Sequence, residues 1–174
     1  RALLTLSRDK EGRTRLLTTN FDTLFERAAH RARMSVTSHA VRAMPKPASY
    51  GDHGILHLHG RIADKGLRLL ESDLVLTSAD FGDAYLRDGW ASQYLEDRIR
   101  TGTLVLLGYS ANDAALRLLL DTIDVDRERF PDLQRIYALD KATPTSKAIW
   151  AGKGTIAVEA TDYDTLYGTV REWS

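Results

Sequence analysis

The sequence contains no cysteine, carries no net charge and has no long apolar run. Without cysteine, the 174-residue chain forms neither disulfides nor a four-thiolate zinc module. Its 24 basic and 24 acidic side chains cancel, so no global charge attracts nucleic acid or an anionic membrane. No stretch approaches the roughly 18 apolar residues of a membrane-spanning helix. These absences favour a cytoplasmic globular protein with neither membrane nor nucleic acid as a partner.

What is present is an alternation of predicted strands and helices, with 43% hydrophobic residues, enough for one sizeable core. We expect strands near 14–18, 35–41, 54–59, 73–77, 103–108, 134–139 and 155–159, and helices near 21–33, 80–100, 112–123, 144–151 and 163–173. This order predicts an α/β fold, a Rossmann-like parallel sheet with helices on both faces. Residues 1–174 are expected to form a single domain.

Polar residues follow three of these strands at their carboxyl ends. Thr18-Thr19-Asn20-Phe21-Asp22 follows an apolar pair, and a buried-looking strand ends in His57-Leu58-His59-Gly60. A third apolar strand breaks at Gly108-Tyr109-Ser110. In an open parallel sheet, ligands bind outside the carboxyl ends of the strands. The three motifs together therefore predict a nucleotide site.

In this order the three motifs resemble those of the sirtuin superfamily, and most closely those of bacterial sirtuin-like domains, which carry Thr-Thr-Asn-Phe/Tyr-Asp, His-Leu-His-Gly and Gly-Tyr-Ser. The resemblance covers residues 14–123 well and the rest loosely. It implies a Rossmann-like fold that binds NAD. Many bacterial relatives hydrolyse NAD to nicotinamide and ADP-ribose as a regulated step in defence against phage, and the resemblance implies the same activity here.

Two residues are the candidate catalytic groups for such a reaction. Loss of nicotinamide builds positive charge on the ribose, so the site needs a group that orients water and a base near the ribose hydroxyls. Asn20 can orient the water and the ribose, and this role is favoured over capping a helix over 21–33, although both roles could hold at once. His59 matches the family's histidine and is the candidate general base; taken alone, a histidine at a strand end is more often structural.

The other candidate residues would bind NAD, which is the substrate here. They are Thr18, Thr19, Asp22, Gly60, Gly108, Tyr109, Ser110 and Asp140. By the resemblance Asp22 contacts the nicotinamide carboxamide, but an acidic residue here also complements a helix dipole. Asp140 is assigned to the adenosine ribose by analogy with dinucleotide folds.

The remaining histidines and aromatic residues have simpler interpretations. His53, His57 and His59 could suggest a metal site, but no carboxylate or thiolate completes the set at a recognisable spacing, so we predict no metal. His57 is expected to be a packed, hydrogen-bonded core histidine. The helical spacing of Phe81, Tyr85, Trp90 and Tyr94 indicates a core or interface position.

The resemblance leaves one part of the site unassigned. Sirtuin relatives begin with a glycine-rich turn that binds the pyrophosphate, whereas here only Gly12 precedes the first motif. We therefore expect the phosphate cradle upstream of residue 1, and the chain to be a fragment of a longer protein with a fused or associated regulatory domain. The sequence is compatible with a homo-oligomer. Alternatives to the hydrolase are an NAD-sensing module without turnover, an ADP-ribosyl or deacylase-type transferase, and a structural interaction domain.

Overall fold

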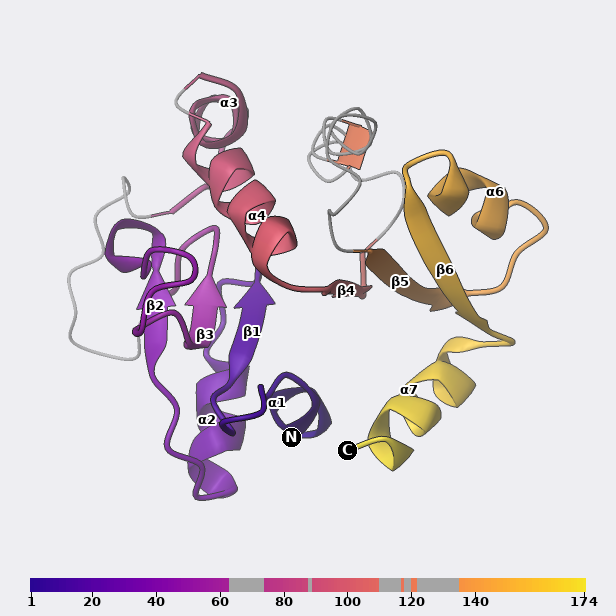
Figure 1. The fold of residues 1–174 in the computed structure, drawn as a ribbon, viewed down its shortest axis with the longest axis horizontal. Coiled ribbons are helices and arrows are strands. Elements are labelled where there is room, and N and C mark those ends of the chain that lie inside the picture. The colour runs from indigo at the N-terminus through magenta and orange to yellow at the C-terminus, as the bar shows by residue number, and fades with distance from the viewer. Residues whose placement is uncertain (63–73, 88, 110–116, 118–119, 122–134) are drawn as a thin grey trace. The chain divides into compact units, whose positions relative to one another are not determined.

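The computed structural model describes residues 1–62, 74–87, 89–109, 117, 120–121 and 135–174. The chain comprises two compact units, formed by residues 1–91 with 173–174 and by residues 92–172. Each unit contains a three-stranded parallel sheet with helices around it, so the predicted Rossmann-like α/β class is confirmed (Figure 1). Within the described part, no helix has the length and apolarity to cross a membrane.

The first unit is built on a sheet whose strands are ordered β1-β3-β2. Its elements are α1 (Ala2–Leu6), β1 (Arg15–Thr18), α2 (Leu24–Arg31), β2 (Ser38–Ala40), a 3-10 turn (Val41–Ala43), β3 (Gly54–His57), α3 (Ser78–Gly82) and a π-helical segment (Asp83–Arg87). The central strand β3 is parallel to both neighbours and buried along its whole length.

The core of the first unit lies against one face of β3. Ile55 packs with Leu4 of α1 and Ala29 of α2, and all three side chains are at most 4% exposed. Side chains alternate along a strand, so Ile55 and His57 share this face and α2 covers both. The helix therefore stands directly over the carboxyl end of β3.

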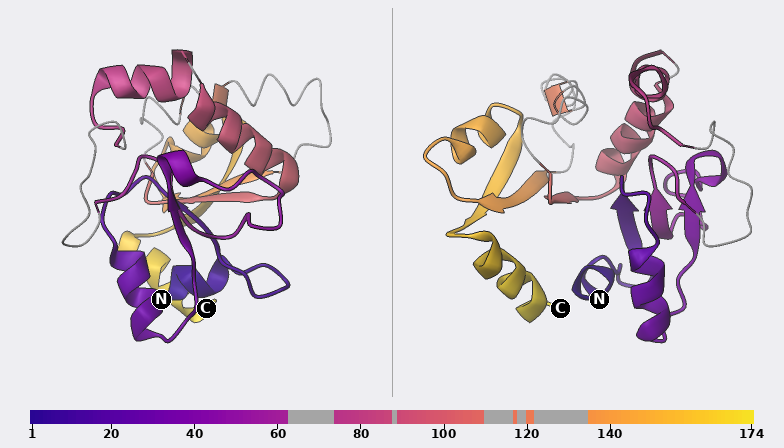
Figure 2. Two further views of the ribbon diagram at one scale, coloured as in Figure 1. Left: turned by 90° about the vertical axis from the view of Figure 1, so that its left-hand side faces the viewer. Right: turned by 180° about the vertical axis from the view of Figure 1, so that it is seen from behind.

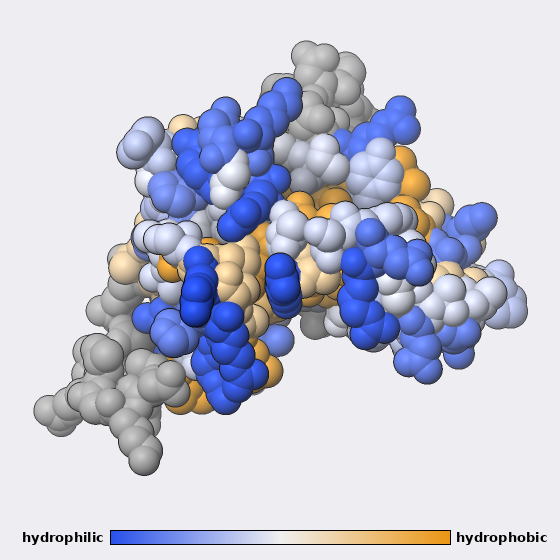
Figure 3. Space-filling model, turned by 90° about the horizontal axis from the view of Figure 1, so that it is seen from below, coloured by the Kyte–Doolittle hydropathy of each residue, from blue (hydrophilic) through white to orange (hydrophobic). Residues whose placement is uncertain are grey.

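The second unit has the strand order β4-β5-β6. Its elements are α4 (Trp90–Thr101), whose first two residues belong to the other unit, β4 (Leu104–Leu107), β5 (Ile136–Lys141), α6 (Ser146–Ala151), β6 (Thr155–Ala160) and α7 (Tyr163–Glu172). Both α6 and α7 pack against β5 and β6. Figure 2 shows α6 and α7 beside β5 and β6 from two further sides. Trp150 of α6 is 1% exposed and lies in the core of this unit. On the face drawn in Figure 3, hydrophilic residues predominate, in keeping with the 28% charged content of the sequence.

Three sequence predictions need correction. The helix expected over 80–100 is divided into α3, the π-helical segment and α4, with Gly89 at a φ of +61° before α4. The strand expected near 73–77 is absent from its described residues, because Thr77 instead caps α3 in a capping box with Asp80. The strand expected over 35–41 is reduced to β2. Most of the expected helix 112–123 lies outside the described residues.

Gly54, the first residue of β3, is the clearest test of backbone constraint. Its φ is +123°, and an added Cβ would lie 2.5 Å from Thr37 Oγ1 and 2.6 Å from the Thr37 carbonyl oxygen. Gly54→Ala is therefore expected to lower the free energy of unfolding by about 2 kcal/mol, measured by urea denaturation. Gly51→Ala is the matched control, since a Cβ there meets nothing within 4 Å. Equal stability of the two variants would show that a Cβ at position 54 is accommodated without strain.

Candidate active site

The first two motifs meet at one edge of the first unit's sheet. β1 and β3 are neighbouring parallel strands whose last residues pair in register. The turns that follow them are joined by backbone hydrogen bonds, from Leu58 N–H to Thr18 O at 2.9 Å and from Ile62 N–H to Phe21 O at 2.8 Å. The structure therefore places the motif around Asn20 beside the motif around His59.

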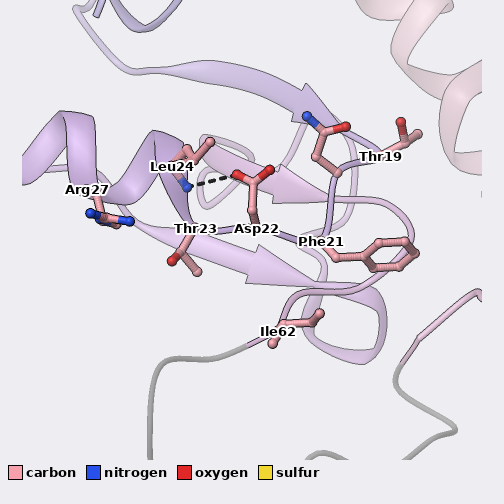
Figure 4. A pocket seen from close by; sticks show the side chains of 8 residues that line it. Thr19, Phe21, Asp22, Thr23, Leu24, Arg27 and Ile62 are labelled. Atoms are coloured by element: carbon pink, nitrogen blue, oxygen red, sulfur yellow. Dashed lines mark hydrogen bonds between the residues drawn. The ribbon is translucent and has the colours of Figure 1, made fainter.

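A pocket of about 600 Å³ opens at the first of these turns (Figure 4). It is lined by residues 19–24 together with Arg27 and Ile62. Its size lies within the usual range for sites of small molecules and cofactors. An amide, a carboxylate and a guanidinium from Asn20, Asp22 and Arg27 face one ligand-sized space, and they offer donors and acceptors of both charges.

Asn20 does not cap the helix, so that alternative is wrong. Helix α2 begins at Leu24 with Thr23 as its N-cap residue. The Leu24 N–H is instead bound by Asp22 Oδ1 at 2.9 Å, the hydrogen bond drawn in Figure 4. Asp22 thus supports the start of α2 and also lines the pocket. Asn20 is exposed and lines the same pocket.

His59 sits in an aromatic surrounding after the end of β3. Its Nε2 lies 2.7 Å from the hydroxyl oxygen of Tyr85. The two rings meet edge to face with centroids 5.8 Å apart, and Phe21 lies 6.4 Å away on the pocket side of the motif. Such contacts fix the plane of the imidazole. The Nε2 atom of His59 is thus already engaged by the Tyr85 hydroxyl.

Tyr85 is the site residue that sequence reasoning missed. Its helical spacing from Phe81 predicted a core position, and the ring is indeed only 7% exposed and stacks on Phe81 with centroids 4.4 Å apart. The same spacing carries no information about His59, which lies 26 positions away in sequence. Only the fold brings the phenol hydroxyl to the imidazole.

The other predicted residues of the first unit lie in the same two turns. Thr18 is buried, and its Oγ1 accepts the Asn20 N–H at 3.1 Å. Thr19 lines the pocket. Gly60 adopts a φ of +92° and donates its N–H to His57 O, which turns the chain after His59.

The remaining candidates belong to the second unit or lie outside the described residues. Gly108 has a φ of +76° directly after β4, and Tyr109 follows it. Ser110 lies outside the described residues. The Asp140 carboxylate accepts hydrogen bonds from the Trp150 indole at 3.0 Å and from the Lys141 N–H at 2.7 Å. The roles of these four residues in NAD binding stay predictions.

The histidines that could suggest a metal have other partners. Both ring nitrogens of His57 face protein oxygens, and His53 Nδ1 lies 3.2 Å from Tyr50 O. In the part of the chain that the structure describes, no three His, Cys, Asp or Glu residues are grouped to hold a metal ion. The prediction that His57 is a packed, hydrogen-bonded core residue is confirmed by its exposure of 0%.

Comparison with known proteins adds two findings. The family model of the SIR2-like domain matches residues 14–168. The chain is also similar to the "Uncharacterized protein y4cA" of Sinorhizobium fredii (strain NBRC 101917 / NGR234), with 46% identity over 166 residues. That match covers 93% of this chain but 14% of the relative, so the chain spans about one seventh of the relative's length.

Proposed function

Because the chain belongs to the SIR2-like domain family, whose members are NAD-dependent enzymes, we propose that it hydrolyses NAD to nicotinamide and ADP-ribose. The observation that carries the proposal is the meeting of Asn20 and His59 at the carboxyl ends of the adjacent strands β1 and β3, beside a ligand-sized pocket. This is the edge at which parallel sheets of this class bind nucleotides. Rossmann-like topology alone would not distinguish a hydrolase from other proteins, so the argument depends on these side chains.

The chemistry assigned to the site follows from its donors and acceptors. Water adds to the anomeric carbon of the nicotinamide ribose as the bond to the nicotinamide nitrogen breaks, and the bonding electrons leave with nicotinamide. The Asn20 amide orients the water and the ribose through its donor and acceptor atoms. His59 accepts a proton from a ribose hydroxyl, and that hydroxyl is restored by the proton that the added water loses. His59 then releases its proton to solvent, and the Tyr85 hydroxyl holds its imidazole in place. Asp22 is assigned to the nicotinamide carboxamide.

The direct test is incubation of the purified full-length protein, which would include the expected phosphate cradle, with NAD and chromatography of the products. Nicotinamide and ADP-ribose in equal amounts, without any added acceptor, support the hydrolase. Release of nicotinamide only when an acceptor peptide is present would indicate the transferase instead. Calorimetric binding of NAD without turnover would indicate a sensing module, and a lack of binding to any nucleotide would favour an interaction domain.

A role in defence against phage is proposed as the setting for this activity. The resemblance to bacterial domains of that kind motivates it. Uncontrolled hydrolysis of NAD would harm the cell, so a regulated enzyme is required. In bacteria that express the protein, NAD should be stable during growth and fall after phage infection. An unchanged NAD pool during infection would contradict this role.

Tyr85→Phe should lower the rate of NAD cleavage by about fivefold without unfolding the protein. The variant keeps the stacking on Phe81 but removes the hydroxyl bonded to His59, and one hydrogen bond contributes about 1 kcal/mol. Nicotinamide release is the measurement. Tyr94→Phe is the control, because this tyrosine is similarly buried and its hydroxyl accepts a hydrogen bond from Arg98 of the same helix. Similar losses in both variants would argue against a specific role for Tyr85.

A further inference from the structure

His57 is completely buried, and both of its ring nitrogens lie at hydrogen-bonding distance from oxygen atoms. Nδ1 is 2.9 Å from the backbone carbonyl oxygen of Asn20, and Nε2 is 2.7 Å from Oε1 of Glu26 on α2. The side chain is 0% exposed. The candidate site therefore has a polar connection to the interior that the proposed reaction does not use.

Counting the hydrogens in this network gives the charge of His57. A carbonyl oxygen only accepts hydrogen bonds, and so does an ionised carboxylate. Burial alone would raise the pKa of Glu26, but hydrogen bonds from His57 and Ser38 outweigh that effect and hold the pKa at about 2. Since a neutral imidazole has one N–H, only a doubly protonated ring satisfies both oxygens.

The rest of the network has a consistent donor direction. Ser38 Oγ donates to Glu26 Oε1 at 2.5 Å, and Arg61 Nη1 donates in turn to Ser38 Oγ. Arg61 Nη1 also lies 3.6 Å from Glu26 Oε1. Among the described residues, the charged groups near His57 are Glu26 from α2 and Arg61 after β3, while β2 contributes the neutral Ser38 and β1 the neutral Thr18. The hydrogen bonds of Arg61 and Ser38 thus run toward the Glu26 carboxylate.

We infer that His57 is a positively charged positioning residue that, anchored by Glu26, holds the backbone of Asn20 and so directs the Asn20 side chain into the pocket. Its Nδ1–H fixes the Asn20 carbonyl, while Thr18 Oγ1 fixes the Asn20 N–H at 3.1 Å. With both peptide groups held, the Cα–Cβ bond of Asn20 has one direction. Only the consequence for catalysis rests on the proposed function; the charge and the clamp do not.

The first experiment needs neither a variant nor activity. In ¹⁵N-labelled protein, NMR should show both ring nitrogens of His57 carrying hydrogens from about pH 6 to pH 8, the range in which free histidine, added as an internal standard, loses its second proton. The spectrum of His57→Asn identifies the signals by their disappearance. A neutral tautomer of His57 at pH 7 would overturn the inference, whether or not the protein cleaves NAD.

The second experiment separates positioning from general structural support. Glu26→Gln keeps the shape and acceptor oxygen of the side chain but removes the charge that stabilises the imidazolium. A buried cation without a counter-charge is disfavoured, so the variant weakens the hold of His57 on Asn20. We expect kcat for NAD cleavage to fall about tenfold, with KM changed less than kcat.

Glu11→Gln is the matched control, since this glutamate is 64% exposed and pairs with Arg13. Its kcat and KM should coincide with those of the wild type. A rise in KM as large as the fall in kcat in Glu26→Gln would overturn the positioning role. If the wild type releases no nicotinamide, the proposed function fails, and the NMR result still decides the charge and clamp of His57.

Discussion

His59→Ala is expected to reduce NAD cleavage by a factor of about 10² to 10⁴, the usual contribution of a positioned general base. Asn20→Ala should cause a loss of similar size, because the water and the ribose lose their orienting amide. Asn20 is exposed and His59 is only half-buried, so both variants should keep the thermal melting temperature of the wild type within a few degrees. Nicotinamide release and thermal melting are measured together.

His30→Ala is the control for this pair, since His30 is an exposed residue of α2 away from the lining of the pocket. It should cleave NAD at the wild-type rate. Wild-type turnover by a folded His59 or Asn20 variant would remove that residue from the catalytic assignment. The Tyr85 variant then shows whether the remaining activity depends on the orientation of the imidazole.

The buried central strand was predictable because its sequence signal is local. Ile55 and Leu56 belong to an apolar run that the structure buries as the central strand β3. The placement of the Asn20 and His59 motifs at one edge followed from the rule that ligand-binding residues follow parallel strands. The pairing of β1 with β3, rather than with the next strand along the chain, is a long-range property that no local pattern encodes.

The helical region before α4 shows where periodicity fails. Phe81 and Tyr85 have the spacing of one continuous helix, yet a π-helical segment begins at Asp83. A π-helical turn changes the direction of the side chains that follow it. Hydrophobic spacing is nearly the same for the two geometries, so the sequence predicted a helix but not its interruption.

The polar side of the site was only partly predictable. The buried position of His57 was anticipated from its strand, but its partner Glu26 lies on a helix 31 positions away. Asn20 had two possible roles in the sequence, and the start of α2 at Leu24 removes the capping role. Residues with similar sequence patterns thus differ in role because of hydrogen bonds to partners far away in the sequence.

The Glu26–His57 pair also predicts how stability changes with pH. The folded protein holds the pKa of Glu26 at about 2, compared with 4.5 for an unperturbed glutamate, because the hydrogen bonds from His57 and Ser38 outweigh the effect of burial. The stabilisation from ionised Glu26 is therefore fully present above about pH 4.5 and is lost as the pH falls toward 2. Because the Glu26 side chain is 23% exposed, solvent weakens the interaction somewhat, and we expect its ionised form to stabilise the fold by about 2 to 3 kcal/mol.

Glu26→Gln should accordingly lower the free energy of unfolding by that amount at pH 7, and the difference from the wild type should shrink steadily between about pH 4.5 and pH 2.5. Urea denaturation at a series of pH values measures it. Glu11→Gln, at an exposed glutamate, should follow the wild type throughout. A difference that stays constant down to pH 2.5 would mean that Glu26 stabilises the fold by packing rather than by charge. The charge assigned to His57 would then lose its support from stability.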